Sequence, residues 1–188
     1  ACGGEKIWAE VADPLGRPIQ AFYGVLRDGT AVIEMAAASG LPLLKDSEKQ
    51  ILKTSTYGTG QLISDALKRG CREFILGLGG SATNDGGAGA AAALGIRYLD
   101  REGNEIRSGG ALNQLEQIDP SQSQAGLGQA RFKIACDVNN PLYGPNGAAH
   151  IYAPQKGANQ QKVVLLDQGL QRLACVIKAQ TEIGRAHV

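Results

Sequence analysis

The side chains best suited to chemistry lie in a glycine-rich segment, residues 77–89, which reads GLGGSATNDGGAG. A short apolar run precedes it and an alanine-rich run follows, so the segment is expected to join a strand to a helix. Consecutive glycines let backbone N–H groups converge on an anion, and a helix start adds a favourable dipole. Ser81, Thr83 and Asn84 add donors, and Asp85 adds a carboxylate suited to magnesium or a substrate hydroxyl. The segment predicts a site for phosphate or carboxylate groups.

Two other interpretations of this segment stay open. The pattern Gly77-x-Gly79-x-x-Ala82 matches the loose form of a dinucleotide-binding turn, and Asp100 lies near the expected distance beyond it. Residues 84–87 weigh against that interpretation, because their sequence NDGG interrupts a helix before it can start. The segment is also compatible with a tight turn that binds nothing. The P-loop motif and the protein-kinase motifs are absent from the sequence.

The surrounding pattern predicts an α/β protein with a parallel sheet and flanking helices. Alternating or apolar runs predict strands at residues 5–11, 18–25, 30–35, 73–78, 96–99 and 131–138. Amphipathic or alanine-rich runs predict helices at residues 58–69, 88–94 and 160–180. Residues 100–129 are expected to be loop with short helical pieces. Strand–helix–strand alternation in the middle of the chain indicates right-handed crossovers.

Composition excludes several classes of partner. The net charge of +1 gives no electrostatic footprint for nucleic acid, and no apolar run approaches the length of a membrane span. We therefore expect no nucleic-acid partner and no membrane partner. The scattered cysteines are interpreted as reduced thiols, which gives a cytoplasmic location as the expectation. Four scattered cysteines and two histidines do not favour a disulfide framework or a histidine-rich metal site.

Several further blocks, in order along the chain, resemble the bacterial glycerate kinase family. The glycine segment GGSATNDGG at 79–87 is similar to that family's signature, and the resemblance spans about residues 5–180. The other matching blocks are DPLG at 13–16, IEMAAASGL at 33–41, TS at 54–55 with GTG at 58–60, ACDV at 135–138 leading into NPL at 140–142, and PQKGA at 154–158. The resemblance implies a two-lobed glycerate kinase type α/β fold, with ATP and Mg²⁺ as cofactors and D-glycerate as the small-molecule substrate.

The resemblance also implies phosphorylation at O2, which gives 2-phosphoglycerate, with 3-phosphoglycerate as the alternative product. Asp85 and Asp137 are the candidate catalytic carboxylates and possible magnesium ligands. Candidates for binding substrate or phosphate are Gly79, Gly80, Ser81, Thr83, Asn84, Gly86, Gly87, Lys156, Glu34, Ser39, Ser55 and Thr59. Simpler roles stay open for several of them: a turn cap for Asp137, a solvated charge for Lys156, a strand-face carboxylate for Glu34, and helix caps for the hydroxyl residues.

The family's chain is roughly twice as long, so residues 1–181 are expected to be a central portion of such a kinase, with parts of two lobes. Residues 182–188 resemble translated sequencing-adapter sequence and are predicted to be a non-native tail. A fragment of this kind is expected to be inactive by itself. A non-catalytic module that binds a sugar acid or a nucleotide, or a Rossmann-type NAD-binding protein, is the alternative, and the oligomeric state is open.

Overall fold

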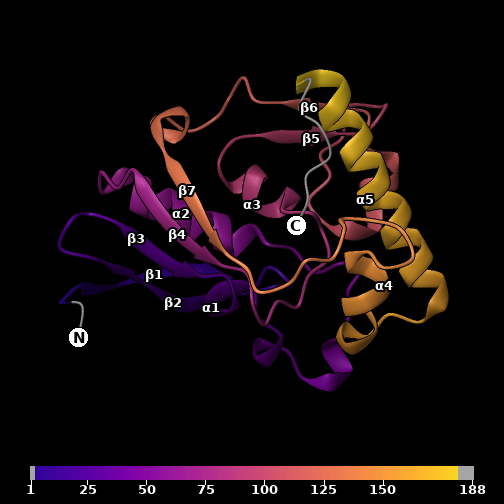
Figure 1. Ribbon diagram of the computed structural model, residues 1–188, viewed down its shortest axis with the longest axis horizontal. Helices are drawn as coiled ribbons and strands as arrows, with labels where there is room; N and C mark the ends of the chain where they lie inside the picture. Colours follow the sequence, from indigo (N-terminus) through magenta and orange to yellow (C-terminus); the bar gives the residue numbers. More distant parts are fainter. Residues whose placement is uncertain (1–2, 182–188) are drawn as a thin grey trace.

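A five-stranded mixed sheet forms one side of the molecule (Figure 1). The computed structural model describes residues 3–181, so the predicted non-native tail lies outside the described part. The strand order is β1-β2-β3-β4-β7, with β1, β2 and β3 antiparallel and β3, β4 and β7 parallel. The strands are β1 (Glu5–Ala12), β2 (Pro18–Val25), β3 (Ala31–Glu34), β4 (Glu73–Gly77) and β7 (Arg131–Ala135).

Turn chemistry closes the hairpin between β1 and β2. Asp13 Oδ1 accepts hydrogen bonds from the backbone N–H of Leu15 at 2.8 Å and of Arg17 at 2.9 Å. Gly16 takes a φ of +87°, a conformation that side chains disfavour. This hairpin sets the register in which Tyr23 and its inward neighbours face the core.

Helix α2 (Tyr57–Lys68) covers one face of the sheet. The apolar face that the sequence predicts for this helix is confirmed as buried: Leu62, Ile63, Ala66 and Leu67. These side chains form one core with inward residues of β1 to β4. Gly70 follows the helix with a φ of +94° and ends it, as its position predicts.

A second core lies around the long helix α5 (Gln160–Thr181), which is drawn in yellow along the edge of the molecule opposite β1 and β2 (Figure 1). Val163, Leu166, Leu170 and Leu173 form its buried face, so the amphipathic helix predicted there is confirmed. Helices α3 (Ala88–Ala93) and α4 (Ala148–Tyr152) contribute to the same core. The other short elements are α1 (Ala36–Ser39) and the 3₁₀ turns Leu41–Leu43, Asp46–Glu48, Gly109–Gln114, Leu127–Gln129 and Pro154–Lys156.

The predicted strand at 96–99 forms, but it does not join the parallel sheet. It is β5 (Arg97–Leu99), and it pairs antiparallel with β6 (Gln117–Asp119) in a separate two-stranded sheet. Helix α3 has only six residues, about 9 Å of rise, which is too short to carry the chain back along β4. The parallel neighbour of β4 is instead β7, and residues 100–129 hold β6 besides the predicted helical pieces.

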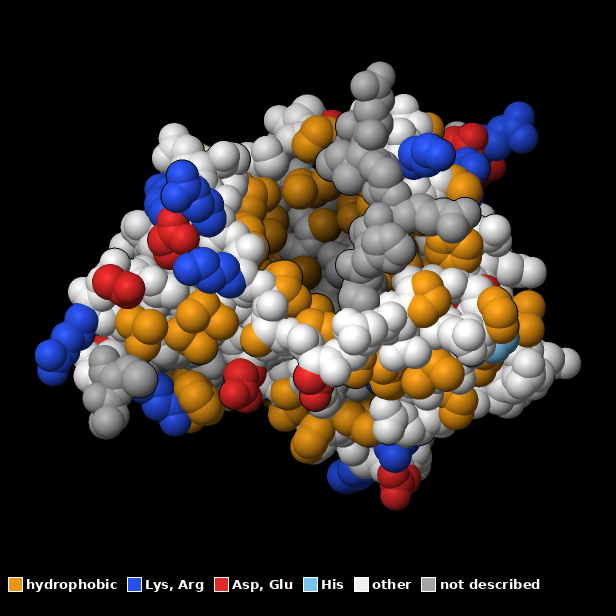
Figure 2. Space-filling view, in the orientation of Figure 1, with side chains coloured by type: hydrophobic (Ala, Val, Ile, Leu, Met, Phe, Trp, Pro, Cys, Tyr) orange, Lys and Arg blue, Asp and Glu red, His pale blue; other side chains and the backbone are white. Residues whose placement is uncertain are grey.

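Strand β7 forms an edge of the sheet, and all five of its residues are exposed. Phe132 stacks on the core residue Phe74 with ring centroids 4.7 Å apart, but Ile134 is 51% exposed. Figure 2 shows hydrophobic side chains around a hollow beside this strand. The strand ends at Ala135, three residues before the predicted end, and the chain then leaves the sheet toward Asp137.

Candidate functional site

The three parallel strands end at one edge of the sheet, and the predicted site residues follow them. Backbone hydrogen bonds join the strand ends: Met35 N donates to Gly77 O at 3.0 Å, and Leu78 N donates to Ala135 O at 3.4 Å. The segment after β3, the glycine segment after β4 and the loop after β7 therefore begin next to one another. Ligand sites in open α/β sheets form at this carboxyl edge.

The glycine segment is held against the end of α1. Leu41 N donates to Gly80 O at 2.8 Å, and Ala82 N donates to Ser39 O at 2.9 Å. Gly80 has a φ of +70°, which requires a glycine, and no heavy atom lies within 4 Å of the position that a side chain at Gly79 would take. The backbone at Gly79 is thus open to a ligand, as an anion-binding loop requires.

Lys156 reaches into this segment from a 3₁₀ turn in the second half of the chain. Its Nζ donates to Ser81 Oγ at 2.6 Å and to the backbone O of Thr83 at 2.7 Å. The residue is only 6% exposed, so Lys156 is not a solvated surface charge. Burial lowers the pKa of the Lys156 ammonium to about 8, against the opposing field of Asp85. The ammonium form still predominates at neutral pH and can attract an anion.

Asp85 lies beneath the segment, 1% exposed, with both carboxyl oxygens occupied. Its Oδ2 accepts from Thr56 N at 2.8 Å, from Thr56 Oγ1 at 2.8 Å and from Gly89 N at 3.2 Å. Its Oδ1 accepts from Gly87 N at 3.1 Å. Burial raises the pKa of Asp85, and these hydrogen bonds act in the opposite direction. Four donors facing one carboxyl group is the arrangement that suits an ionised carboxylate.

Three of the predicted hydroxyl residues hold the loops together. Ser39 Oγ and Thr59 Oγ1 are hydrogen-bonded at 2.7 Å, and both side chains are buried. Ser55 Oγ donates to Arg107 O at 2.6 Å and accepts from Tyr57 N at 3.3 Å, so it serves the start of α2. These contacts connect the segment after β3 and the backbone at Arg107 to the first turn of α2.

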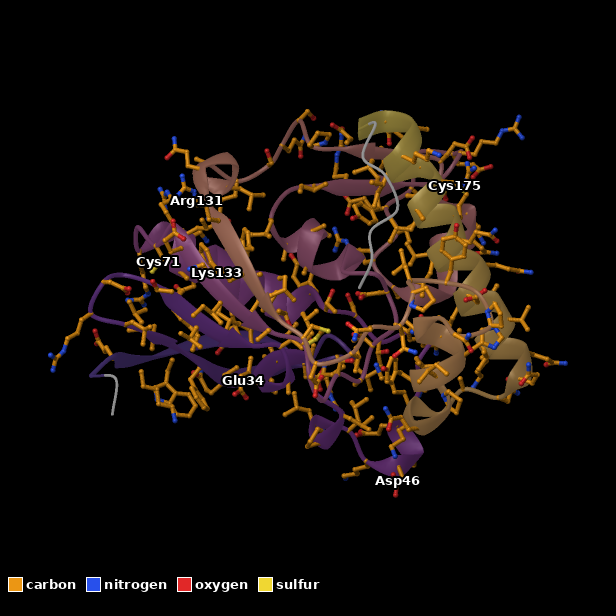
Figure 3. The ribbon with its side chains drawn as sticks, in the orientation of Figure 1. Glu34, Asp46, Cys71, Arg131, Lys133 and Cys175 are labelled. Atoms are coloured by element: carbon orange, nitrogen blue, oxygen red, sulfur yellow. The ribbon has the colours of Figure 1, made fainter. Side chains whose placement is uncertain are left out.

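Glu34 and Asp137 are the exposed carboxylates at this edge. Glu34 is the last residue of β3, lies opposite Gly77 in the register and projects outward (Figure 3). Asp137 follows β7 in an exposed loop. Within residues 3–181 the structure shows no cluster of three or more His, Cys, Asp or Glu side chains that could enclose a metal ion. A cation here would therefore need ligands from a bound phosphate as well.

Asn84 and Thr56 complete the polar set. Asn84 is buried, and its Oδ1 has no hydrogen-bond partner among the described residues. Thr56 is not among the residues that the sequence predicted, although its hydroxyl bonds Asp85 and also accepts from Ala90 N at 2.9 Å. The available signal was a threonine two residues before the predicted helix at 58–69, close to the position that favours a cap. Gly86 and Gly87, with φ of +58° and +80°, turn the chain from Asp85 into α3.

The fold and this edge define an α/β protein with a glycine loop, an enclosed lysine and two exposed carboxylates. The model of the glycerate kinase family matches residues 1–187, and the chain belongs to that family. A glycerate kinase of Bacillus subtilis is 51% identical over 176 residues, which are 93% of this chain and 46% of the relative. A glycerate 2-kinase of Escherichia coli is 49% identical over 180 residues, which are 95% of this chain and 47% of the relative.

A solved structure gives the same match in three dimensions. A Salmonella typhimurium LT2 protein described as glycerate kinase 2 superposes with a TM-score of 0.94 at 44% identity, over 98% of this chain and 50% of that one. The chain thus spans about half the length of the relatives it matches, and the resemblance seen in the sequence blocks is confirmed. Among the described helices, none combines the length and apolar character needed to cross a membrane.

Proposed function

We propose that the protein to which this chain contributes transfers a phosphoryl group from ATP to D-glycerate and forms 2-phosphoglycerate. The observation that carries the proposal is the buried Lys156 ammonium inside the glycine loop of a glycerate kinase family chain. Because the chain spans about half the length of its relatives, the complete activity belongs to a longer polypeptide. The name of the Escherichia coli relative, glycerate 2-kinase, supports O2 as the acceptor.

The residues divide the work of a phosphoryl transfer, which depends on positioning and charge stabilisation. The open backbone at Gly79 and the Ser81 and Thr83 side chains are suited to phosphate or carboxylate oxygens. Lys156 supplies positive charge from a buried position, where the lower dielectric lets it act more strongly than at the surface. We assign to Gly80, Gly86 and Gly87 the shape of the loop, and to the buried Asn84 a polar contact within it.

Asp137 is the carboxylate best placed to accept the proton of the substrate hydroxyl or to ligate magnesium. It is exposed at the carboxyl edge, so a substrate and a solvated ion can reach it. One carboxylate together with phosphate oxygens is a common way to hold Mg²⁺, which would neutralise phosphate charge. Glu34 lies at the same edge and is the second candidate. Because ATP is a substrate of the proposed reaction, we expect it to occur in the cytoplasm.

The test uses a full-length parent protein that contains this sequence, with Asp137→Asn and Glu34→Gln compared against the unaltered enzyme. Glycerate-dependent ADP release is measured together with the position of the phosphate in the product. We expect Asp137→Asn to lower kcat by about 10²-fold or more, as loss of an acid–base group does. Near-parental kcat in Asp137→Asn would remove Asp137 from this role. A parent protein that turns over no ATP when glycerate is added would overturn the activity and leave a binding module.

A further inference from the structure

Asp85 differs from the exposed carboxylates of this region because it is enclosed and both of its oxygens already accept hydrogen bonds from the protein. Its two oxygens accept four hydrogen bonds, and its side chain is fully enclosed. A base that takes a proton from a substrate must lie within hydrogen-bond reach of that proton. Asp85 meets this requirement only if the loop around it is dismantled.

The four bonds of Asp85 instead connect two helices to the glycine loop. Thr56 precedes the first residue of α2, while Gly87 and Gly89 lie at the start of α3. The Thr56 hydroxyl donates to Asp85 and accepts from Ala90 N, so the contact runs through both helices. A carboxylate at the amino ends of two helices also gains from their dipoles, which favours its ionised form.

The loop that Asp85 holds in place is also the loop that binds the Lys156 ammonium. The backbone O of Thr83, two residues before Asp85, accepts from Lys156 Nζ at 2.7 Å. Ala82 lies between Ser81 and Thr83, and its backbone O accepts from Thr54 Oγ1 at 2.9 Å. The short run from Ser81 to Asp85 is therefore fixed at both of its ends, to Lys156 and to the start of α2.

We propose that Asp85 is a positioning residue, which fixes the glycine loop to the starts of α2 and α3 and keeps the Lys156 ammonium charged and aimed at the bound anion. The part that concerns the bound anion rests on the function proposed above. The part that concerns the lysine does not, because the contacts exist without a ligand.

The other titratable groups on the elements around Lys156 make contacts with other residues. Lys49 lies behind Gly157 and pairs with Asp46 at 2.7 Å. At the start of α5, Lys162 Nζ donates to Gly157 O at 3.5 Å. His150 on α4 has its Nε2 4.0 Å from Asp167 Oδ2, and the Tyr98 phenol lies in the field of Asp85 itself. Asp85 lies two residues after Thr83, whose backbone O accepts from Lys156 Nζ at 2.7 Å, and its negative charge opposes the lowering of the Lys156 pKa by burial.

The test measures how fast each lysine of the 188-residue chain reacts with acetic anhydride across a pH series, read by peptide mass spectrometry. The variant is Asp85→Asn, which keeps the size and removes the charge. The matched control is Asp13→Asn, since Asp13 is also a buried carboxylate that holds a turn, but its charged partner is Arg17. The exposed Lys6 and Lys53 serve as internal standards.

We expect the reaction of Lys156 to become about tenfold faster in Asp85→Asn below the lysine pKa, because a shift of one unit multiplies the neutral amine tenfold. The pH midpoint of its labelling should fall, and Asp13→Asn should change neither quantity. An unchanged midpoint in Asp85→Asn, or an equal change in Asp13→Asn, would overturn the proposal. None of these readings requires turnover, so they remain valid even if the parent enzyme does not phosphorylate glycerate.

A second pair of variants covers the case in which Asp85→Asn does not fold. Thr56→Val removes the hydroxyl that bonds Asp85 and Ala90, whereas Thr56→Ser keeps it. We expect faster labelling of Lys156 in Thr56→Val and wild-type labelling in Thr56→Ser. If Thr56→Val leaves Lys156 unchanged, the loop is not positioned through this contact and the proposal is wrong.

Discussion

Replacing Lys156 by methionine tests the electrostatics of the site directly. Methionine keeps most of the length and volume of the side chain but removes the ammonium. The lysine is 6% exposed, and burial lowers its pKa from 10.5 to about 8. A folded-state pKa below the unfolded value means that the folded protein holds the lysine proton less tightly than the unfolded chain does.

The size and sign of the effect follow from these two values. Below pH 8 Lys156 is protonated in both the folded and the unfolded protein. The folded protein is then destabilised by the full free energy of burying the charged side chain, about 3 kcal/mol for a pKa difference of this size. As the pH rises from 8 toward 10.5, the unfolded state binds more protons, so stability increases. We expect wild type to gain about 2 kcal/mol between about pH 7 and about pH 9.5, relative to a chain without this lysine.

Urea unfolding of wild type and Lys156→Met over that pH range measures this gain. The change in the free energy of unfolding with pH in the variant is subtracted from the change in wild type. Groups common to both proteins cancel, including Tyr23 and Tyr98, whose pKa values burial raises. At neutral pH the variant leaves Ser81 Oγ and Thr83 O without their donor, which costs about 1–3 kcal/mol and partly offsets the charge it removes. Parallel pH dependences for the two proteins would refute the electrostatic reasoning.

Three stability predictions follow, each measured by urea unfolding at neutral pH. Phe74→Ala should cost about 3–5 kcal/mol, because Phe74 is 1% exposed and leaves a cavity in the core. Ile134→Ala should change stability by less than about 0.5–1 kcal/mol, because that side chain is half exposed at the edge of the sheet, and a larger loss would mean that it is covered. Gly86→Ala should cost at least about 1 kcal/mol, because the φ is +58° and the new Cβ would lie 2.4 Å from Leu173 Cδ2.

Local patterns predicted most of the fold, and long-range pairing supplied what they missed. The 5–11, 18–25 and 160–180 predictions agree with β1, β2 and α5 to within a residue, because alternation, turn residues and a helical stripe are local signals. The partner of β5 was misjudged because pairing depends on residues about 20 positions apart. Strand order across the sheet is likewise set by contacts that no local window contains.

For the candidate site, residue type predicted location better than role. The sequence predicted that the glycine segment, Lys156 and Asp137 belong to one site, because the blocks that contain them resemble the same family in the same order. Burial distinguishes two residues that type alone could not: Asp85 and Asp137 both follow parallel strands, but Asp85 is enclosed and Asp137 is exposed. Their roles as candidates stay predictions that the variants above test.

The separation of the two buried charges supports the proposal that this loop binds an anion. In the described part of the chain, Lys156 Nζ is bonded to a hydroxyl and a carbonyl, not to a carboxylate. Asp85 is in turn satisfied by backbone N–H groups and a hydroxyl. If the two were in direct contact, an incoming phosphate or carboxylate would have to displace a buried carboxylate, which is costly. Because each charge is solvated by neutral dipoles, Lys156 keeps its charge near Asp85 and still has a donor available for a ligand.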